Sequence, residues 1–198
     1  MSSIYHVAIN KRKVQEMRTL RKFELENNRR IEFLLEDSNE YGYFSDLTIE
    51  YYVKNKKIQL FDDFVVEGVR TFRNFLQKCI NGEKILPAKY FEKGIGYQGD
   101  KTAQKIAEGD FSDNDAASSF LLWETVSGTA TWMYNYQGQI YLEISTQYKY
   151  NYSEPDDDFI SFETYLSNYK IVDRVELELA MIVKWYEDVN VILNKLDD

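Results

Sequence analysis

The sequence predicts an α+β fold, in which an antiparallel sheet of hairpins and a meander is packed by long helices, including a C-terminal helix. Aromatic and β-branched residues alternate on both sides of Gln137-Gly138, within residues 129–144, which predicts a two-stranded antiparallel pair. Apolar residues recur every three or four positions from Val175 to Leu196, which predicts a long final helix. With 44% apolar and 16% aromatic residues, residues 1–198 are expected to form a single domain.

The first 46 residues leave two interpretations open. Residues 4–9 predict a short opening strand. For residues 10–46, an apolar residue at every third position fits a helix, whereas the apolar pairs on both sides of Asn27-Asn28 fit a hairpin equally well. The apolar residues of the helical pattern are Val14, Met17, Leu20 and Phe23.

A clearer pattern begins at Leu47. Residues 47–53 alternate apolar and polar side chains and predict a strand, with residues 58–60 as its partner after a polar turn at 54–57. A helix is then expected to begin at a cap formed by Asp62 or Asp63 and to end at Asn81-Gly82. Its apolar stripe consists of Val65, Val69, Phe72, Leu76 and Cys79. The position of Cys79 on this stripe predicts a core residue rather than a nucleophile.

Residues 83–118 show the least regular pattern, although residues 100–108 are compatible with a helix. They contain a GxGxxG motif at Gly94, Gly96 and Gly99. A dinucleotide site requires an apolar strand that leads into such glycines, and the preceding residues 89–93 do not provide one. A flexible glycine-rich loop is therefore predicted.

The remaining elements lie in the second half of the chain. Residues 120–126 predict a buried strand, which Ser127-Gly128 turns into the 129–144 hairpin, giving a three-stranded meander. Asp173 followed by Glu176 fits a capping box and places the start of the final helix there. The apolar stripe of this helix, expected to lie across one face of the sheet, consists of Val175, Leu179, Ile182, Tyr186, Val189, Leu193 and Leu196.

Charge is distributed unevenly along the chain. The net charge is −9; residues 1–99 carry 17 basic and 14 acidic side chains, whereas residues 100–198 carry 7 and 19. A field of this sign repels nucleic acid and anionic membranes and attracts basic partners, so neither nucleic acid nor a membrane is predicted as a partner. Ordinary solubility explains the charge equally well.

The composition offers little for catalysis or cofactor binding. With one cysteine and one histidine, the chain has neither an intrachain disulfide nor a usual zinc site, and we expect a cytoplasmic protein without a cofactor. No apolar stretch approaches the roughly 20 residues that span a bilayer, and the first residues do not resemble a signal peptide. The sequence contains two acidic clusters, one formed by Asp110, Asp113 and Asp115 and the other by Glu154, Asp156, Asp157 and Asp158. Both lack the EF-hand pattern, and they predict solvated loops or a partner-facing patch rather than a metal site. We expect no enzyme; the alternative is a small hydrolase that uses paired carboxylates such as Glu143 and Glu163.

The last sixty residues or so resemble bacterial immunity proteins, which neutralise polymorphic or contact-dependent toxins. The resemblance is a succession of strand, acidic loop, short helix and long helix; residues 1–118 do not take part in it. It is carried by residues 141–144, Tyr148, the acidic residues 154–158, residues 160–166, residues 168–170 and a terminal helix that contains Trp185. It implies a small cytosolic inhibitor that binds the toxin domain of its own cell and blocks the active site or an essential surface of that domain.

The charge pattern suits a partner of this kind. Carboxylates steer a basic, nuclease-type toxin towards the inhibitor and mimic phosphate groups. Aromatic side chains anchor the contact. Immunity proteins diverge fastest at their contact surfaces, so these residues are chosen for charge and aromatic character rather than from a motif. The predicted contact residues are Glu154, Asp156, Asp157, Asp158, Tyr150 and Tyr152, followed by Asp110, Asp113 and Asp115.

Overall fold

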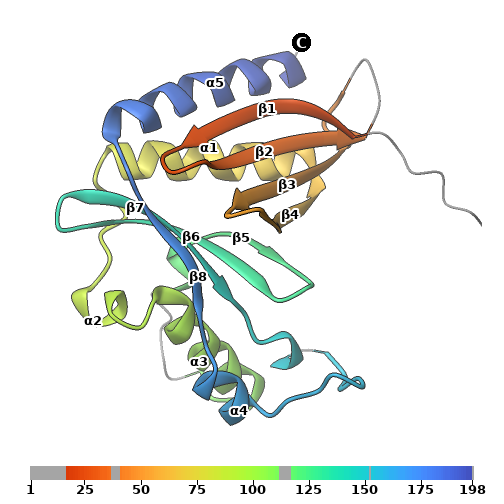
Figure 1. Ribbon diagram of the computed structural model, residues 1–198, viewed down its shortest axis with the longest axis vertical. Coiled ribbons are helices and arrows are strands. Elements are labelled where there is room, and N and C mark those ends of the chain that lie inside the picture. The colour runs from red at the N-terminus through yellow and green to blue at the C-terminus, as the bar shows by residue number, and fades with distance from the viewer. Residues whose placement is uncertain (1–16, 37–40, 112–116, 152, 198) are drawn as a thin grey trace, which may run out of the picture.

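Two four-stranded antiparallel meanders form the α+β fold that the sequence predicts. The computed structural model describes residues 17–36, 41–111, 117–151 and 153–197 (Figure 1). The first sheet consists of β1 (Met17–Leu25), β2 (Arg29–Glu36), β3 (Asp46–Val53) and β4 (Lys56–Phe64), in that order. The second consists of β5 (Leu121–Thr125), β6 (Thr129–Tyr136), β7 (Gln139–Thr146) and β8 (Ile171–Leu177).

A long helix follows each meander, and the two helices pack against each other. They are α1 (Val65–Ile80) and α5 (Leu179–Asp197), which lie side by side over the first sheet (Figure 1). The rings of Phe23, Phe33, Phe72, Trp123 and Trp185 contact one another between the two helices and the two sheets, with centroids 5.0 to 6.0 Å apart. One apolar cluster therefore includes residues of both sheets and both helices.

Tight turns fix three of the hairpins: two residues connect β3 to β4 and β6 to β7, and three connect β1 to β2. The central residues Asn27-Asn28, Lys54-Asn55 and Gln137-Gly138 all have positive φ, as type I′ turns require. Asparagine tolerates this conformation, and Phe23 and Phe33 are both buried on the inner face, so residues 17–36 form a hairpin and the helical alternative is wrong. The strand expected at residues 4–9 lies outside the described residues.

Helix α1 has the predicted apolar face but a different beginning. All five residues of the predicted stripe are buried, and Gly82, with φ 69°, ends the helix as expected. The prediction that Asp62 or Asp63 caps the helix is wrong, because β4 continues to Phe64, which pairs with Asp46 of β3. Asp62 accepts a hydrogen bond from the Thr48 hydroxyl across the two strands (3.1 Å).

The predicted glycine-rich loop is also wrong, because the motif begins helix α3 (Ile95–Ala107), which follows the short helix α2 (Ala88–Phe91). Gly94, with φ 92°, immediately precedes α3. A Cβ on Gly99 would lie 2.9 Å from the ring of Trp132, and one on Gly96 would collide with the Ser145 hydroxyl. The glycines therefore allow α3 to lie directly on the second sheet.

Residues 171–177 form a strand, so the prediction that the last helix begins near Asp173 is wrong. β8 pairs with β7 from Ser145↔Ile171 to Ile140↔Leu177, and α5 begins at Leu179. The carboxylate of Asp173 does not cap a helix; it accepts hydrogen bonds from Arg29 (2.8 Å) and from the Tyr51 hydroxyl (2.7 Å). From Ile182 onward the apolar stripe of the helix faces the core, whereas Leu179 is exposed.

Candidate functional site

A groove separates the outer edges of the two sheets, where β4 faces β5. Its volume is about 610 Å³. The lining comes from β4, from β5 with its following turn, from α1, and from the segment after β7. These residues are Gln59, Phe61, Asp62, Asp63, Thr71, residues 121–126, Gly128, residues 147–149 and Ser153. We call this cleft the acidic groove.

The name reflects the charges of the lining. The side chains of Asp62, Asp63 and Glu124 are exposed carboxylates, and among the described residues of the lining only Lys149 is a cation. The ammonium of Lys149 is already paired with Asp156, at 3.0 Å. Excess negative charge in a cleft favours a cationic ligand.

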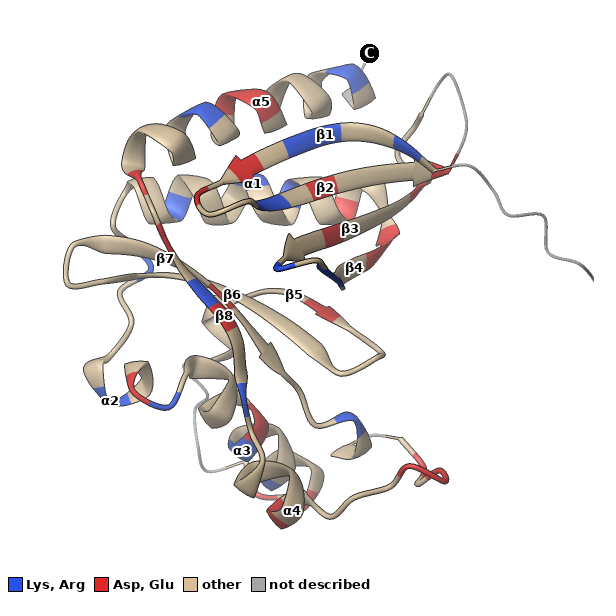
Figure 2. Ribbon diagram, in the orientation of Figure 1, with Lys and Arg blue, Asp and Glu red and all other residues tan. Residues whose placement is uncertain are grey.

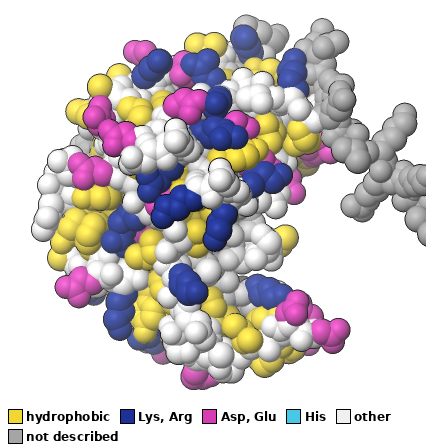
Figure 3. All heavy atoms as spheres, viewed as in Figure 1, with side chains coloured by type: hydrophobic (Ala, Val, Ile, Leu, Met, Phe, Trp, Pro, Cys, Tyr) yellow, Lys and Arg dark blue, Asp and Glu magenta, His cyan; other side chains and the backbone are white. Residues whose placement is uncertain are grey.

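Residues 154–158, here called the acidic loop, project beside the groove. They follow the short helix η2 (Lys149–Asn151) and form the red segment at the lower right of Figure 2. Figure 3 shows acidic side chains at this tip of the molecule, next to a notch in its outline. Lys149 belongs to the groove and binds the loop through Asp156, so the groove and the loop adjoin.

Asp156 organises the acidic loop. It accepts hydrogen bonds from the Tyr150 hydroxyl (2.5 Å) and the Asp158 backbone N–H (3.0 Å), as well as the Lys149 contact. The Tyr150 hydroxyl and the Lys149 ammonium hold the pKa of Asp156 below its ordinary value. The ring of Tyr150 packs edge-on against Phe159, with the centroids 5.1 Å apart.

The predicted contact residues therefore differ in their surroundings. Glu154, Asp156, Asp157 and Asp158 are all exposed, and Asp156 also accepts the hydrogen bond of the half-buried Tyr150. Asp110 is exposed just after α3. Tyr152, Asp113 and Asp115 lie outside the described residues.

Asp100 of α3 fastens the segment that carries the acidic loop. This carboxylate is only 4% exposed and accepts hydrogen bonds from the Tyr148 backbone N–H (2.9 Å) and the Tyr165 hydroxyl (2.5 Å). The Tyr148 hydroxyl donates to the carbonyl of Ile160 (3.0 Å), which closes the segment on itself. Burial raises the pKa of Asp100 to about 6, against the effect of these hydrogen bonds.

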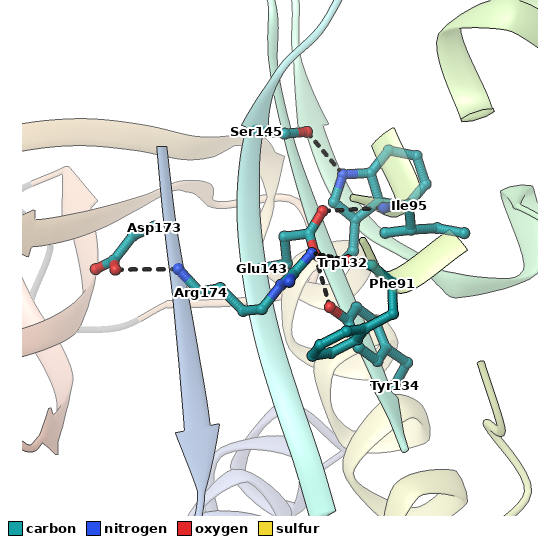
Figure 4. Close-up of polar contacts among 8 residues, drawn as sticks. All are labelled: Phe91, Ile95, Trp132, Tyr134, Glu143, Ser145, Asp173 and Arg174. Carbon is teal, nitrogen blue, oxygen red and sulfur yellow. Dashed lines mark hydrogen bonds and ion pairs between the residues drawn. The ribbon is translucent and has the colours of Figure 1, made fainter. Parts of the chain in front are cut away.

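Glu143, one of the two carboxylates named for a hydrolase, lies at the centre of a second buried cluster (Figure 4). It is fully buried on β7; one oxygen accepts the Ile95 N–H at the start of α3 (3.1 Å), and the other accepts the Tyr134 hydroxyl (2.6 Å) and Nε of Arg174 (2.8 Å). The positive end of the α3 dipole favours this carboxylate. The guanidinium of Arg174 also donates to the carbonyl of Phe91 (2.8 Å).

This cluster joins α2 and α3 to the second sheet. Both oxygens of Glu143 are occupied by protein donors, which gives the carboxylate a structural role. Glu163 is exposed on α4 (Phe162–Ser167), so the two carboxylates named for a hydrolase have unlike surroundings.

No protein-family model, no curated protein and no solved structure matches this chain. Within the described ranges, no group of three His, Cys, Asp or Glu residues is placed to hold a metal ion. The helices that the structure describes include none that is both long and apolar enough to cross a membrane.

Sequence reasoning found the acidic loop but missed the groove. The loop is contiguous in sequence, whereas Asp62 and Glu124 belong to different sheets. Asp62 and Asp63 directly precede the apolar stripe of α1, and adjacent aspartates are uncommon in strands. The sequence therefore favours a helix cap there over the end of a strand. No local pattern indicates that β4 and β5 face each other.

Proposed function

We propose that this chain is an immunity protein that binds a cognate bacterial toxin domain in the cytoplasm and inhibits it, with a basic nuclease as a candidate toxin. The observation that carries the proposal is the acidic loop beside the acidic groove. The exposed carboxylates of Glu154, Asp157 and Asp158 extend the charge of the groove onto the adjoining surface. A continuous surface of one sign attracts a partner of the opposite sign and accelerates its association.

Exposed apolar side chains near the charges support a protein partner. Phe159 is 47% exposed beside Tyr150, and Val126 in the groove lining is fully exposed. Phe44 and Phe64, which directly follows Asp63, contact each other with ring centroids 5.5 Å apart and are both exposed. Aromatic anchors surrounded by charges are typical of the energetically important part of a protein interface.

Fixed loop geometry supports tight inhibition. Asp156 orders the loop from within, and Asp100 holds both sides of the segment on α3. A surface that is already ordered loses less conformational entropy when it binds. The charged groups are then available without a folding step.

The experiment is a pull-down from a lysate of the source organism with this chain as bait, followed by native mass spectrometry at low and high salt. We expect one basic toxin domain in stoichiometric amount, with less recovery at high salt. Recovery of a clean monomer alone would contradict the proposal.

A charge variant tests the loop directly. Glu154→Gln, Asp157→Asn and Asp158→Asn together should lower the association rate with the recovered domain about tenfold at low salt. A control variant that removes three exposed charges elsewhere, at Glu36, Glu178 and Glu187, should change the rate much less. Equal rates for the two variants would remove the electrostatic basis of the proposal.

A further inference from the structure

A second, smaller cavity lies between the two long helices α1 and α5. Its volume is about 220 Å³. The lining positions follow one another at spacings of three and four on each helix, so one face of each helix contributes them. They are Arg70, Arg73 and Asn74 of α1 and Asn190, Leu193 and Asn194 of α5. We call this cavity the arginine pocket; no described residue lines both it and the acidic groove.

The arginine pocket has the opposite charge to the protein as a whole. The chain carries a net charge of −9, yet the described lining contains two guanidinium groups and no carboxylate. Within the described ranges, no carboxylate forms an ion pair with Arg70 or Arg73, whereas four other arginines each have such a partner: Arg21, Arg29, Arg30 and Arg174. Asp188 of α5 is one of these partners, since it pairs with Arg21. Two uncompensated positive charges on one helix face favour an anion.

Neighbouring side chains hold the two guanidinium groups in place. Nε of Arg73 donates a hydrogen bond to Oδ1 of Asn190 (3.1 Å), and a terminal nitrogen of Arg73 donates to Oδ1 of Asn74 (3.4 Å). Both amide oxygens are thereby occupied, which leaves the NH₂ group of each asparagine as a donor. The guanidinium of Arg70 lies over the ring of Tyr43, 5.5 Å from its centroid. The pocket therefore offers hydrogen-bond donors from both helices to a ligand.

The donors and the size of the pocket define the class of ligand. The planar guanidinium group matches two oxygens of a phosphate at once, which a lysine ammonium cannot do. Two such groups and the asparagine NH₂ groups can donate to several oxygens of one tetrahedral anion. Pockets for drug-sized ligands begin at roughly 300 Å³, so a cavity of about 220 Å³ suits a phosphate group better than a whole nucleotide.

We propose that the arginine pocket binds a phosphate group, either as inorganic phosphate or as the phosphate of a small phosphomonoester. The bound group contacts α1 and α5 together and so stabilises the packing of the two helices that follow the two meanders. This inference goes beyond the proposed function and does not depend on it.

The test is thermal unfolding of the whole chain in increasing sodium phosphate at about pH 7, with the ionic strength kept constant by sodium chloride. For a Kd of about 1 mM, the melting temperature should rise by about 4 °C at about 10 mM phosphate, along a saturating curve. Phenyl phosphate is titrated in the same way. A larger rise than with inorganic phosphate would identify a phosphomonoester as the ligand, and a smaller rise would identify free phosphate.

Variants separate binding in the pocket from the general stabilising effect of phosphate, which is excluded from protein surfaces. Arg70→Gln changes an exposed side chain and should weaken phosphate binding about fivefold. Arg70→Gln combined with Arg73→Gln should abolish the saturable rise. The matched control, Lys78→Gln with Lys184→Gln, removes two exposed cations of the same helices outside the lining and should keep it.

Two outcomes would overturn the inference. One is a melting temperature of the wild type that does not saturate with phosphate. The other is the same phosphate dependence in the wild type and in Arg70→Gln, which would indicate a general salt effect. Neither outcome bears on the binding of a toxin domain by the acidic loop.

Discussion

Replacing Asp100 by Asn removes a buried carboxylate while keeping nearly the same shape and hydrogen-bonding oxygen. The side chain is 4% exposed and accepts hydrogen bonds from Tyr148 and Tyr165. Burial raises its pKa from 3.8 to about 6, so the folded protein binds a proton more tightly than the unfolded chain. Between about pH 4 and pH 6, the contribution of Asp100 to the free energy of unfolding should therefore fall as the pH rises.

The magnitude follows from the size of the pKa change. A difference of roughly two in pKa corresponds to about 3 kcal/mol, at 1.36 kcal/mol for each tenfold change in proton affinity. The Asn variant lacks this titration. Relative to the wild type, its free energy of unfolding should therefore rise by about 2 kcal/mol between pH 4 and pH 7, which is most of the full difference.

Urea unfolding followed by tryptophan fluorescence measures this difference at several pH values. Comparing variant with wild type cancels the titration of the other carboxylates. Asp46→Asn, at an exposed position, serves as the matched control for the substitution itself. A constant difference between Asp100→Asn and the wild type from pH 4 to pH 7 would refute the buried, proton-binding role of Asp100.

Three substitutions test the packing, each read from urea unfolding. Glu143→Gln leaves the partly buried Arg174 without its counter-charge and should cost about 3 kcal/mol. The exposed control Glu187→Gln should change stability by less than about 0.5 kcal/mol, and equal effects would disprove the role of the cluster. Gly96→Ala places a methyl group against the second sheet and should lower the free energy of unfolding by about 2 kcal/mol. The control Gly42→Ala, at a position with nothing within 4 Å, should not lower it. A neutral Gly96→Ala would show that α3 can shift. Lys54→Asn, at φ 47°, should raise stability by about 0.5 kcal/mol, and a loss would contradict the turn assignment.

Local patterns predicted the elements whose stabilising contacts are local. The β5 to β7 meander followed from alternation and short turns, and α1 followed from its apolar stripe. β8 was misread because Asp173 and Glu176 have the spacing of a capping box and Val175 continues the stripe of the helix. Arg29 and Tyr51, which donate hydrogen bonds to Asp173, lie more than a hundred positions away from it in the sequence. Tertiary contacts of this kind override local propensity.

The candidate site divides in the same way. The acidic loop could be read from consecutive residues, although its internal bond between Asp156 and Tyr150 could not. The groove depends on how two separate sheets are placed around α1. Because that placement depends on tertiary contacts, the sequence alone predicts a helix cap at Asp62 and gives no signal at Glu124.

The most direct test of the central claim is a growth assay with the toxin domain recovered by the pull-down. The domain is expressed in a sensitive strain together with the wild-type chain, the variant neutralised at Glu154, Asp157 and Asp158, or the matched control. The wild type and the control should restore growth, and the loop variant should protect poorly. Growth arrest in the presence of the wild-type chain, or equal protection by the loop variant, would contradict an immunity function based on the acidic loop.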